Sequence, residues 1–152
     1  GPILDNFPAY SGVVIDSGTL AHILLTHDGN GKYELYVNGR LVKLRDRNLV
    51  AAIGKANSFG GTGHALILGG RLRASTVDHT HAHQFKLARV YKKTFTYSEA
   101  RQNFLAAYGI NSPVSNYAEE WSADNYVAGI IKAKVNSEND GTVVNGTIYT
   151  AN

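Results

Sequence analysis

The sequence lacks cysteine and methionine and has a single tryptophan among its 152 residues. Without cysteine the chain can form no disulfide, no thiolate nucleophile and no sulfur-ligated zinc site. No apolar run approaches the roughly 18 residues that a membrane span needs, so we expect no membrane span. Because methionine is absent, the Gly1-Pro2 beginning predicts that residue 1 is not the first residue of the gene product.

Acidic residues are scarce in the middle of the chain. Between Arg40 and Lys93, eleven lysines and arginines stand against Asp46 and Asp78, although the net charge of the whole chain is only +3. Such a stretch suits an anionic partner such as a sulfated or uronic polysaccharide, or an acidic surface on a neighbouring subunit, or simply solvated strand faces. Nucleic acid is not among the partners that we expect.

The distribution of turn-forming residue pairs along the chain is typical of a β protein. Asn-Gly, Asp-Gly and Gly-Gly pairs separate short apolar runs. The clearest signal is a hairpin: Tyr33–Val37 alternates between two faces, Asn38-Gly39 suits a type I′ turn, and Arg40–Leu44 returns. Further strands are predicted over 13–15, 21–26, 65–68, 85–91, 126–135 and 142–150.

One helix is predicted, over 97–108. Thr96-Tyr97-Ser98-Glu99 has the form of a capping box, an apolar stripe that includes Tyr97 follows at helical spacing, and Gly109 suits the left-handed residue after a helix. Residues 115–122 are predicted to form a short turn around Trp121, and 136–141 to join the last two strands as a second hairpin.

Three segments, in this order, resemble the laminin-G-like domains of the concanavalin-A-like superfamily. They are His22–Gly29, Glu34–Val42, and the run from Leu87 to Glu99 with the helix that follows, whose ending resembles versions in phage and other viral structural proteins. The resemblance covers about residues 20–110. It implies an all-β fold, an antiparallel β-sandwich of the jelly-roll, concanavalin-A-like type, with one short α-helix near residues 97–108.

The resemblance also implies a division into a laminin-G-like sandwich region, residues 1–110, and a β-hairpin extension, residues 111–152. Family members carry further strands before the segment that matches His22–Gly29, whereas only a short stretch precedes it here. Half a sandwich cannot close its core. The missing strands are therefore supplied by the extension, by a neighbouring subunit that exchanges its own extension, or by sequence outside this chain.

Two metal sites are worth weighing. In an extended strand His79, His81 and His83 would share one face at a spacing of roughly 6.5–7 Å, where two imidazoles can bind a divalent metal; the alternative is a polar loop or exposed strand face. Calcium is the ion usual in the resembling family, and Asp28 stands at a family-like position in its Asp-Gly turn. An Asx turn is the alternative there.

Catalytic signals are missing. No two carboxylates alternate along a strand as a glycosidase of this fold needs, and no Gly-x-Ser-x-Gly elbow supports a serine nucleophile. We therefore expect no enzymatic activity.

The function that we expect is a non-catalytic carbohydrate-binding or adhesive module on an extracellular or virion surface. The basic region and nearby tyrosines would contact a glycan or anionic polysaccharide, since tyrosine joins an apolar ring to a polar hydroxyl. Tyr36 is either exposed to that ligand or packed in the other layer.

The alternative function of the protein is that of a structural assembly subunit, such as a capsid-decorating, fibre or filament protein, in a homo-oligomer or larger assembly. The candidate ligand-binding residues are Tyr36, Arg40, Lys43, Arg45, Arg71 and Arg73.

Overall fold

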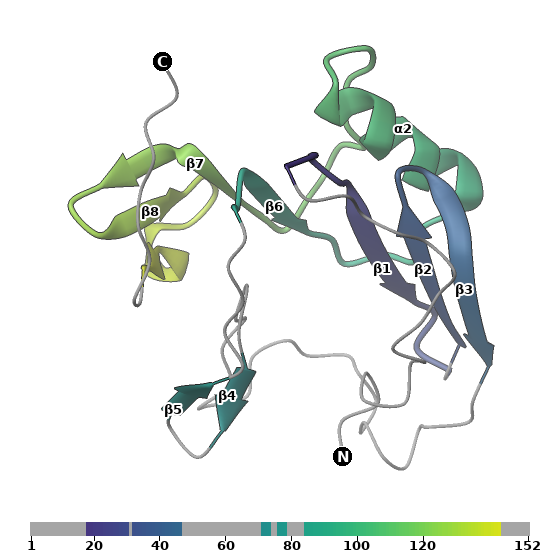
Figure 1. The fold of residues 1–152 in the computed structure, drawn as a ribbon, viewed down its shortest axis with the longest axis horizontal. Helices are drawn as coiled ribbons and strands as arrows, with labels where there is room; N and C mark the ends of the chain where they lie inside the picture. Colours follow the sequence, from purple (N-terminus) through teal and green to yellow (C-terminus); the bar gives the residue numbers. More distant parts are fainter. Residues whose placement is uncertain (1–17, 31, 47–70, 74–75, 79–83, 144–152) are drawn as a thin grey trace. The chain divides into compact units, whose positions relative to one another are not determined.

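The computed structural model describes residues 18–30, 32–46, 71–73, 76–78 and 84–143 (Figure 1). These residues are mostly β, with one α-helix, which confirms the predicted class at this level. In chain order the elements are β1 (Ile23–His27), β2 (Lys32–Val37), β3 (Arg40–Asp46), β4 (Arg71–Arg73), β5 (Thr76–Asp78), β6 (Leu87–Val90), α2 (Tyr97–Ala107), β7 (Glu119–Val127), β8 (Ile130–Ala133), the 3₁₀ turn η2 (Ser137–Asn139) and β9 (Gly141–Thr142).

The strands form three antiparallel sheets, ordered β1-β2-β3, β4-β5 and β6-β7-β8-β9. Contacts divide the chain into two compact units. The first unit comprises residues 1–64 and 93–115, and the second comprises 65–92 and 116–152. The first unit thus contains the β1-β2-β3 sheet and α2, and the second unit contains the other two sheets.

The predicted hairpin is the centre of the first unit. Asn38 and Gly39 have φ values of 50° and 75°, as both central residues of a type I′ turn require. The register pairs Tyr36 with Leu24 on β1 and with Leu41 on β3, and a bulge between Leu35 and Tyr36 shifts the β2–β3 ladder. A local turn signal therefore sets the pairing of β2 with β3.

Helix α2 begins as predicted. The Thr96 hydroxyl accepts a hydrogen bond from the Glu99 amide at 3.2 Å, and the Glu99 carboxylate accepts one from the Thr96 amide at 3.0 Å. At the other end Gly109 has φ 73°. Both signals that defined the helix in the sequence are confirmed.

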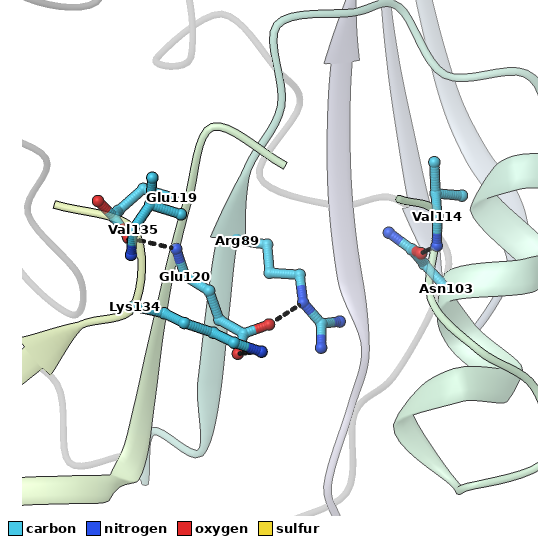
Figure 2. Close-up of polar contacts among 7 residues, drawn as sticks. All are labelled: Arg89, Asn103, Val114, Glu119, Glu120, Lys134 and Val135. Atoms are coloured by element: carbon cyan, nitrogen blue, oxygen red, sulfur yellow. Dashed lines mark hydrogen bonds and ion pairs between the residues drawn. The ribbon is translucent and has the colours of Figure 1, made fainter. Parts of the chain in front are cut away.

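The packing of α2 against the hairpin explains a second property of Gly39. A Cβ at this position would lie 2.9 Å from Cδ1 of Phe104, so the helix approaches the turn more closely than any larger residue allows. On the helix, buried Asn103 accepts a hydrogen bond from the Val114 amide at 2.7 Å (Figure 2). This bond ties the segment after α2 back to the helix.

The second unit is built on the β7–β8 hairpin. Ala128 and Gly129 form its turn with φ values of 49° and 87°. β6 pairs with β7, and β9 pairs with β8 in the register Ile130↔Thr142. The strands of the predicted 111–152 extension therefore pair with β6 of the same chain, rather than with β1–β3, among the residues described.

Two buried glutamates, Glu119 and Glu120, connect segments of this unit through hydrogen bonds and ion pairs (Figure 2). Glu120 binds Arg89 on the neighbouring strand and lies 3.4 Å from the Lys134 ammonium. Glu119, 4% exposed, accepts hydrogen bonds from the amides of Val135 at 2.8 Å and Asn136 at 3.1 Å. Its carboxylate thus holds the chain where it leaves β8.

The environment of Glu119 favours its charged form. Burial is the largest single influence and works against ionisation, but hydrogen bonds from the Asn139 side chain and from the amides of Val135, Glu120 and Asn136 outweigh it. Together they lower the pKa of Glu119 to about 2. The carboxylate is a structural acceptor that stays ionised in most conditions.

Two local expectations are wrong. The predicted turn over 115–122 gives way to strand β7 from Glu119 onward, because this segment pairs with β6. The predicted single strand over 126–135 is interrupted by a turn at Ala128-Gly129. Ala128 has a positive φ, which alanine rarely adopts, so the turn could not be predicted from the residue type. The predicted pairing after 136–141 is confirmed over β9, while strands 13–15 and 65–68 lie outside the described residues.

Within the described parts of the chain, no helix has the length and apolar character to cross a membrane. The helix α2 has 11 residues.

Candidate ligand-binding site

The first unit contains a hollow of about 420 Å³ beside the β1-β2-β3 sheet. It lies where the segment that leads into α2 crosses the strands. Its described lining is mixed, with three aromatic rings, two acidic side chains, a lysine and several hydroxyl groups. The lining residues are Thr26, Asp28, Lys32, Glu34, Tyr36, Leu41, Thr94, Phe95, Thr96 and Tyr97.

Two hydrogen bonds fix the wall of the hollow to β1. The Thr26 hydroxyl, on a buried side chain, accepts from the Phe95 amide at 2.8 Å, and the Thr94 hydroxyl donates to the His27 carbonyl at 2.9 Å. Phe95 itself is 5% exposed. Strand β1 and the approach to α2 are therefore joined both by burial of an aromatic ring and by polar contacts.

Tyr36 forms the floor of the hollow. Its side chain is 2% exposed, and its hydroxyl donates a hydrogen bond to the Glu34 carboxylate at 2.8 Å. Burial, together with that bond and the negative charge of Glu34, raises the pKa of Tyr36 to about 12. Tyr36 thus stays a protonated donor. Of the two alternatives that the sequence left open for Tyr36, exposed to a ligand or packed, the packed one is observed.

Tyr97 stands at the rim. It is the first residue of α2 and is 54% exposed, and its ring centroid lies 6.2 Å from that of Tyr36 at an interplanar angle of 52°. The sequence placed Tyr97 in the apolar stripe of the helix, so its part in the hollow was missed. The capping box was an available signal, because first-turn side chains reach back over the segment that precedes a helix.

The carboxylate of Asp28 also lines the hollow and is held by its own turn. Its Oδ1 atom accepts hydrogen bonds from the amides of Asn30 at 2.7 Å and Lys32 at 3.0 Å. The bond from Asn30 is the main cause that lowers the pKa of Asp28, and it prevails over a smaller opposing effect of desolvation. These are the contacts of an Asx turn.

Calcium at Asp28 stays a prediction. In the described ranges no group of three or more histidine, cysteine, aspartate or glutamate residues is placed to hold a metal ion. The other predicted metal ligands, His79, His81 and His83, lie outside the described residues.

The basic candidates are distributed over both units. Arg40 is exposed on β3, and in the ladder Lys43 lies opposite Leu35 and Arg45 opposite Tyr33. The candidates of the second unit are in β4, where Arg71 pairs with Asp78 and Arg73 with Thr76. Arg40 is not among the described residues that line the hollow, and the side chains of Lys43, Arg45, Arg71 and Arg73 lie outside what the structure describes. Of the predicted site residues, the structure brings together Tyr36 and Asp28.

Comparison of the chain with protein-family models, with curated proteins and with solved structures gives no match. The laminin-G-like resemblance therefore stays a prediction, and the hollow is interpreted from its own chemistry.

Proposed function

We propose that the protein is a non-catalytic carbohydrate-binding or adhesive module, and that the hollow beside Tyr97 receives a sugar ring. The observation that carries this proposal is an exposed tyrosine ring at the rim of a hollow lined by hydroxyl and carboxylate groups. An aromatic face can cover the apolar C–H face of a sugar, and fixed polar groups can bind its hydroxyls. The volume, about 420 Å³, lies in the range of small-molecule sites.

Hydrogen-bonding groups of both kinds are available around the ring. The Lys32 ammonium donates, the carboxylates of Asp28 and Glu34 accept, and the Thr94 hydroxyl, which donates its proton to the His27 carbonyl, can accept as well. Because buried Tyr36 and Phe95 fix the surrounding backbone, these groups are held in place before a ligand arrives. A preformed site avoids part of the entropy cost of ordering side chains on binding.

The chemistry of the two carboxylates supports binding rather than hydrolysis. A retaining or inverting glycosidase needs one carboxyl group that keeps its proton near neutral pH so that it can act as the general acid. The pKa of Asp28 is shifted in the opposite direction. Glu34 already accepts from the Tyr36 hydroxyl and lies 3.3 Å from the Lys32 ammonium.

We also propose that the antiparallel sheets belong to a β-sandwich of the laminin-G-like, concanavalin-A-like type, and that the module acts on an extracellular or virion surface. The order of β1, β2, β3, β6 and α2 along the chain is the support for this fold type. An experimental structure with all residues placed would test it. A single layer of strands in each unit would contradict it.

The glycan proposal has a matched pair of variants for its test. Tyr97→Ala removes the ring at the rim, whereas Tyr108→Ala removes one of equal exposure, 55% against 54%, from the far end of the same helix. A glycan array would identify ligands, and NMR titration of the best one would measure affinity. We expect Tyr97→Ala to weaken binding by about tenfold or more and Tyr108→Ala to leave it unchanged.

Three results would contradict the proposal. They are an array without binding, an equal effect of the two tyrosine variants, and chemical-shift changes that avoid residues 94–97. Cleavage of a bound oligosaccharide on long incubation would contradict the non-catalytic part alone.

A structural assembly subunit is the second candidate function, and strand β1 favours it. β1 is the outer strand of its sheet among the strands described, and residues 21–27 carry no charged side chain. Ile23 and Leu25, on one face of this strand, are 58% and 44% exposed. An uncharged outer strand with exposed apolar residues can pair with another strand, and a second copy of β1, antiparallel to the first, is the partner that we propose.

Light-scattering mass at several concentrations tests the assembly candidate. We expect a dimer or larger species that Leu25→Lys converts to a monomer, with Leu41→Lys, a 43% exposed leucine of β3, as the control. A wild-type protein that is monomeric at all concentrations would rule this candidate out.

A further inference from the structure

The charge of the hollow differs from that of the chain as a whole. The full sequence has a net charge of +3 and its middle is strongly basic. Among the described residues, in contrast, the hollow is lined by two acidic side chains, Asp28 and Glu34, and by one basic side chain, Lys32. The charge balance of this described lining is therefore negative.

Lys32, the lysine of the described lining, does not make the charge of the hollow favourable for an anion. Its ammonium lies 3.3 Å from Glu34, with the lysine side chain 45% exposed and the glutamate side chain 18% exposed. Lys32 thus offsets Glu34, and Asp28 remains as the excess charge. A uronic or sulfated sugar placed here would bring a further negative charge beside a carboxylate, and like charges at close range cost binding energy.

The aromatic groups add to the same preference. The ring centroids of Tyr36, at the floor, and Tyr97, at the rim, lie 6.2 Å apart, and both residues line the hollow together with Glu34. The face of a tyrosine ring attracts a cation placed within about 6 Å of its centroid. Rings and carboxylates together form surroundings in which an ammonium group is favoured over a neutral group, and a neutral group over an anion.

We propose that the hollow selects a hexosamine unit with a free, protonated amino group over neutral and anionic sugars. In this arrangement the sugar ring lies against Tyr97, and its ammonium group faces the carboxylates of Asp28 and Glu34. The inference rests on the proposed function, because it assigns a ligand class to the same site. It also revises the expectation of an anionic polysaccharide, which came from the basic composition of the middle of the chain.

Three tetrasaccharides of equal length provide the test: one of glucosamine, one of N-acetylglucosamine and one of galacturonate. Affinities are measured by calorimetry at about pH 6, where carboxylates are ionised and the free amine is protonated. We expect the glucosamine tetrasaccharide to bind at least about fivefold more tightly than the N-acetylated one. We expect the galacturonate tetrasaccharide to bind most weakly. Since the whole chain is positive, non-specific attraction would give the reverse order.

Charge variants assign the preference to the hollow. Asp28→Asn keeps the Oδ1 acceptor for the amides of Asn30 and Lys32 but removes the charge. Glu34→Gln does the same for the Tyr36 hydroxyl. We expect each to reduce the preference for the amino sugar by about three- to fivefold, and Lys32→Gln to increase it. Asp124→Asn, at an exposed position of β7 in the second unit, is the control with the same change in net charge and should have no effect.

The outcomes distinguish a failure of the proposed function, glycan binding, from a failure of the inferred preference for an amino sugar. If none of the three sugars nor any array glycan binds, the proposed function itself fails. If the neutral sugar binds through Tyr97 as tightly as the amino sugar, or the galacturonate sugar binds best, the function stands and the amino-sugar inference is overturned. A preference that Asp28→Asn and Glu34→Gln leave unchanged, in folded variants, also overturns the inference.

Discussion

The two units differ in the kinds of residues that are buried inside each of them. The buried hydrophobic residues of the described chain all belong to the first unit: Tyr33, Tyr36, Val37, Phe95, Ala100 and Val114. In the described part of the second unit the buried residues are Glu119 and Glu120. In the described residues, apolar packing thus stabilises the first unit, whereas hydrogen bonds and ion pairs to carboxylates stabilise the second.

This difference teaches which perturbations each unit resists. Apolar burial is insensitive to pH but sensitive to the loss of side-chain volume. A buried carboxylate is sensitive to protonation, because removal of its charge leaves its donors poorly satisfied. The hollow lies in the unit held by apolar packing, so its apolar frame should persist under acidic conditions that weaken the second unit, whereas protonation of Asp28 should loosen the Asx turn in its lining.

The largest effect is expected from Tyr36→Ala. Removal of this fully packed ring should lower the free energy of unfolding of the first unit by about 3–5 kcal/mol. Denaturant unfolding measures the change, and hydrogen exchange of the Phe95 amide, which donates to Thr26, assigns it to the first unit. Tyr97→Ala, at the exposed rim, is the control and should cost less than about 1 kcal/mol. Equal costs for the two tyrosines would contradict the description of Tyr36 as the floor.

Glu119→Gln should have the next largest effect, about 2–3 kcal/mol, localised to the second unit. The substituted amide keeps the shape of the side chain but places an NH₂ group among donors. Exchange of the Val135 and Asn136 amides, which donate to Glu119, should accelerate, while that of Phe95 should not. The exposed Glu138→Gln serves as the control. Uniform acceleration in both units would show that they do not respond separately.

Acid should weaken the second unit before the first. The pKa of Glu119 is lowered to about 2 in the folded state, below the value near 4.3 of an unfolded glutamate. Its contribution to stability is therefore fully present above about pH 5 and is lost as pH falls toward 2. Trp121, the single tryptophan, lies in this unit and bonds to the Asn139 carbonyl at 2.7 Å. Its fluorescence should report the transition, and Glu119→Gln should flatten the profile in this range.

Lys134→Met should have the smallest effect on the free energy of unfolding. The lysine side chain is 56% exposed, so water and salt screen its ion pair with Glu120, whereas the Arg89 partner is 19% exposed. Thermal unfolding at low and high salt measures the difference. Arg89→Met should cost more than Lys134→Met. A larger cost for Lys134→Met than for Arg89→Met would mean that the less exposed ion pair, Arg89 with Glu120, is not the more stabilising of the two.

Elements defined by neighbours in the chain could be predicted. The hairpin around Asn38-Gly39 and the helix that begins at Thr96 are each specified by two or more residues with a local mechanism, positive φ in one case and capping in the other. Strand β7 was not predictable in the same way. Residues 119–122 become a strand by pairing with β6, about thirty positions earlier, which no local propensity encodes.

The candidate site shows the same limit. Asp28 and Tyr36 were identified from their residue types and positions, but the sequence left open whether Tyr36 is exposed or packed, because alternation along a strand does not tell which face another element will cover. Tyr97 lines the hollow together with Phe95, whose amide donates to the Thr26 hydroxyl of β1, a contact between distant segments. The five basic candidates followed from composition, which carries no information on which side chains converge.

The sequence by itself determined the β character of the chain, the β2–β3 hairpin, the limits of α2 and the scarcity of acidic residues in its middle. These depend on backbone preferences and hydrogen bonds among residues a few positions apart. The tertiary structure decided that Tyr36 is buried, that Tyr97 lines the same hollow as two carboxylates, and that the buried residues in the described part of the second unit are glutamates. The physical reason is that burial and the local balance of charge arise from contacts between distant segments, and each such contact is fixed only when the whole unit packs.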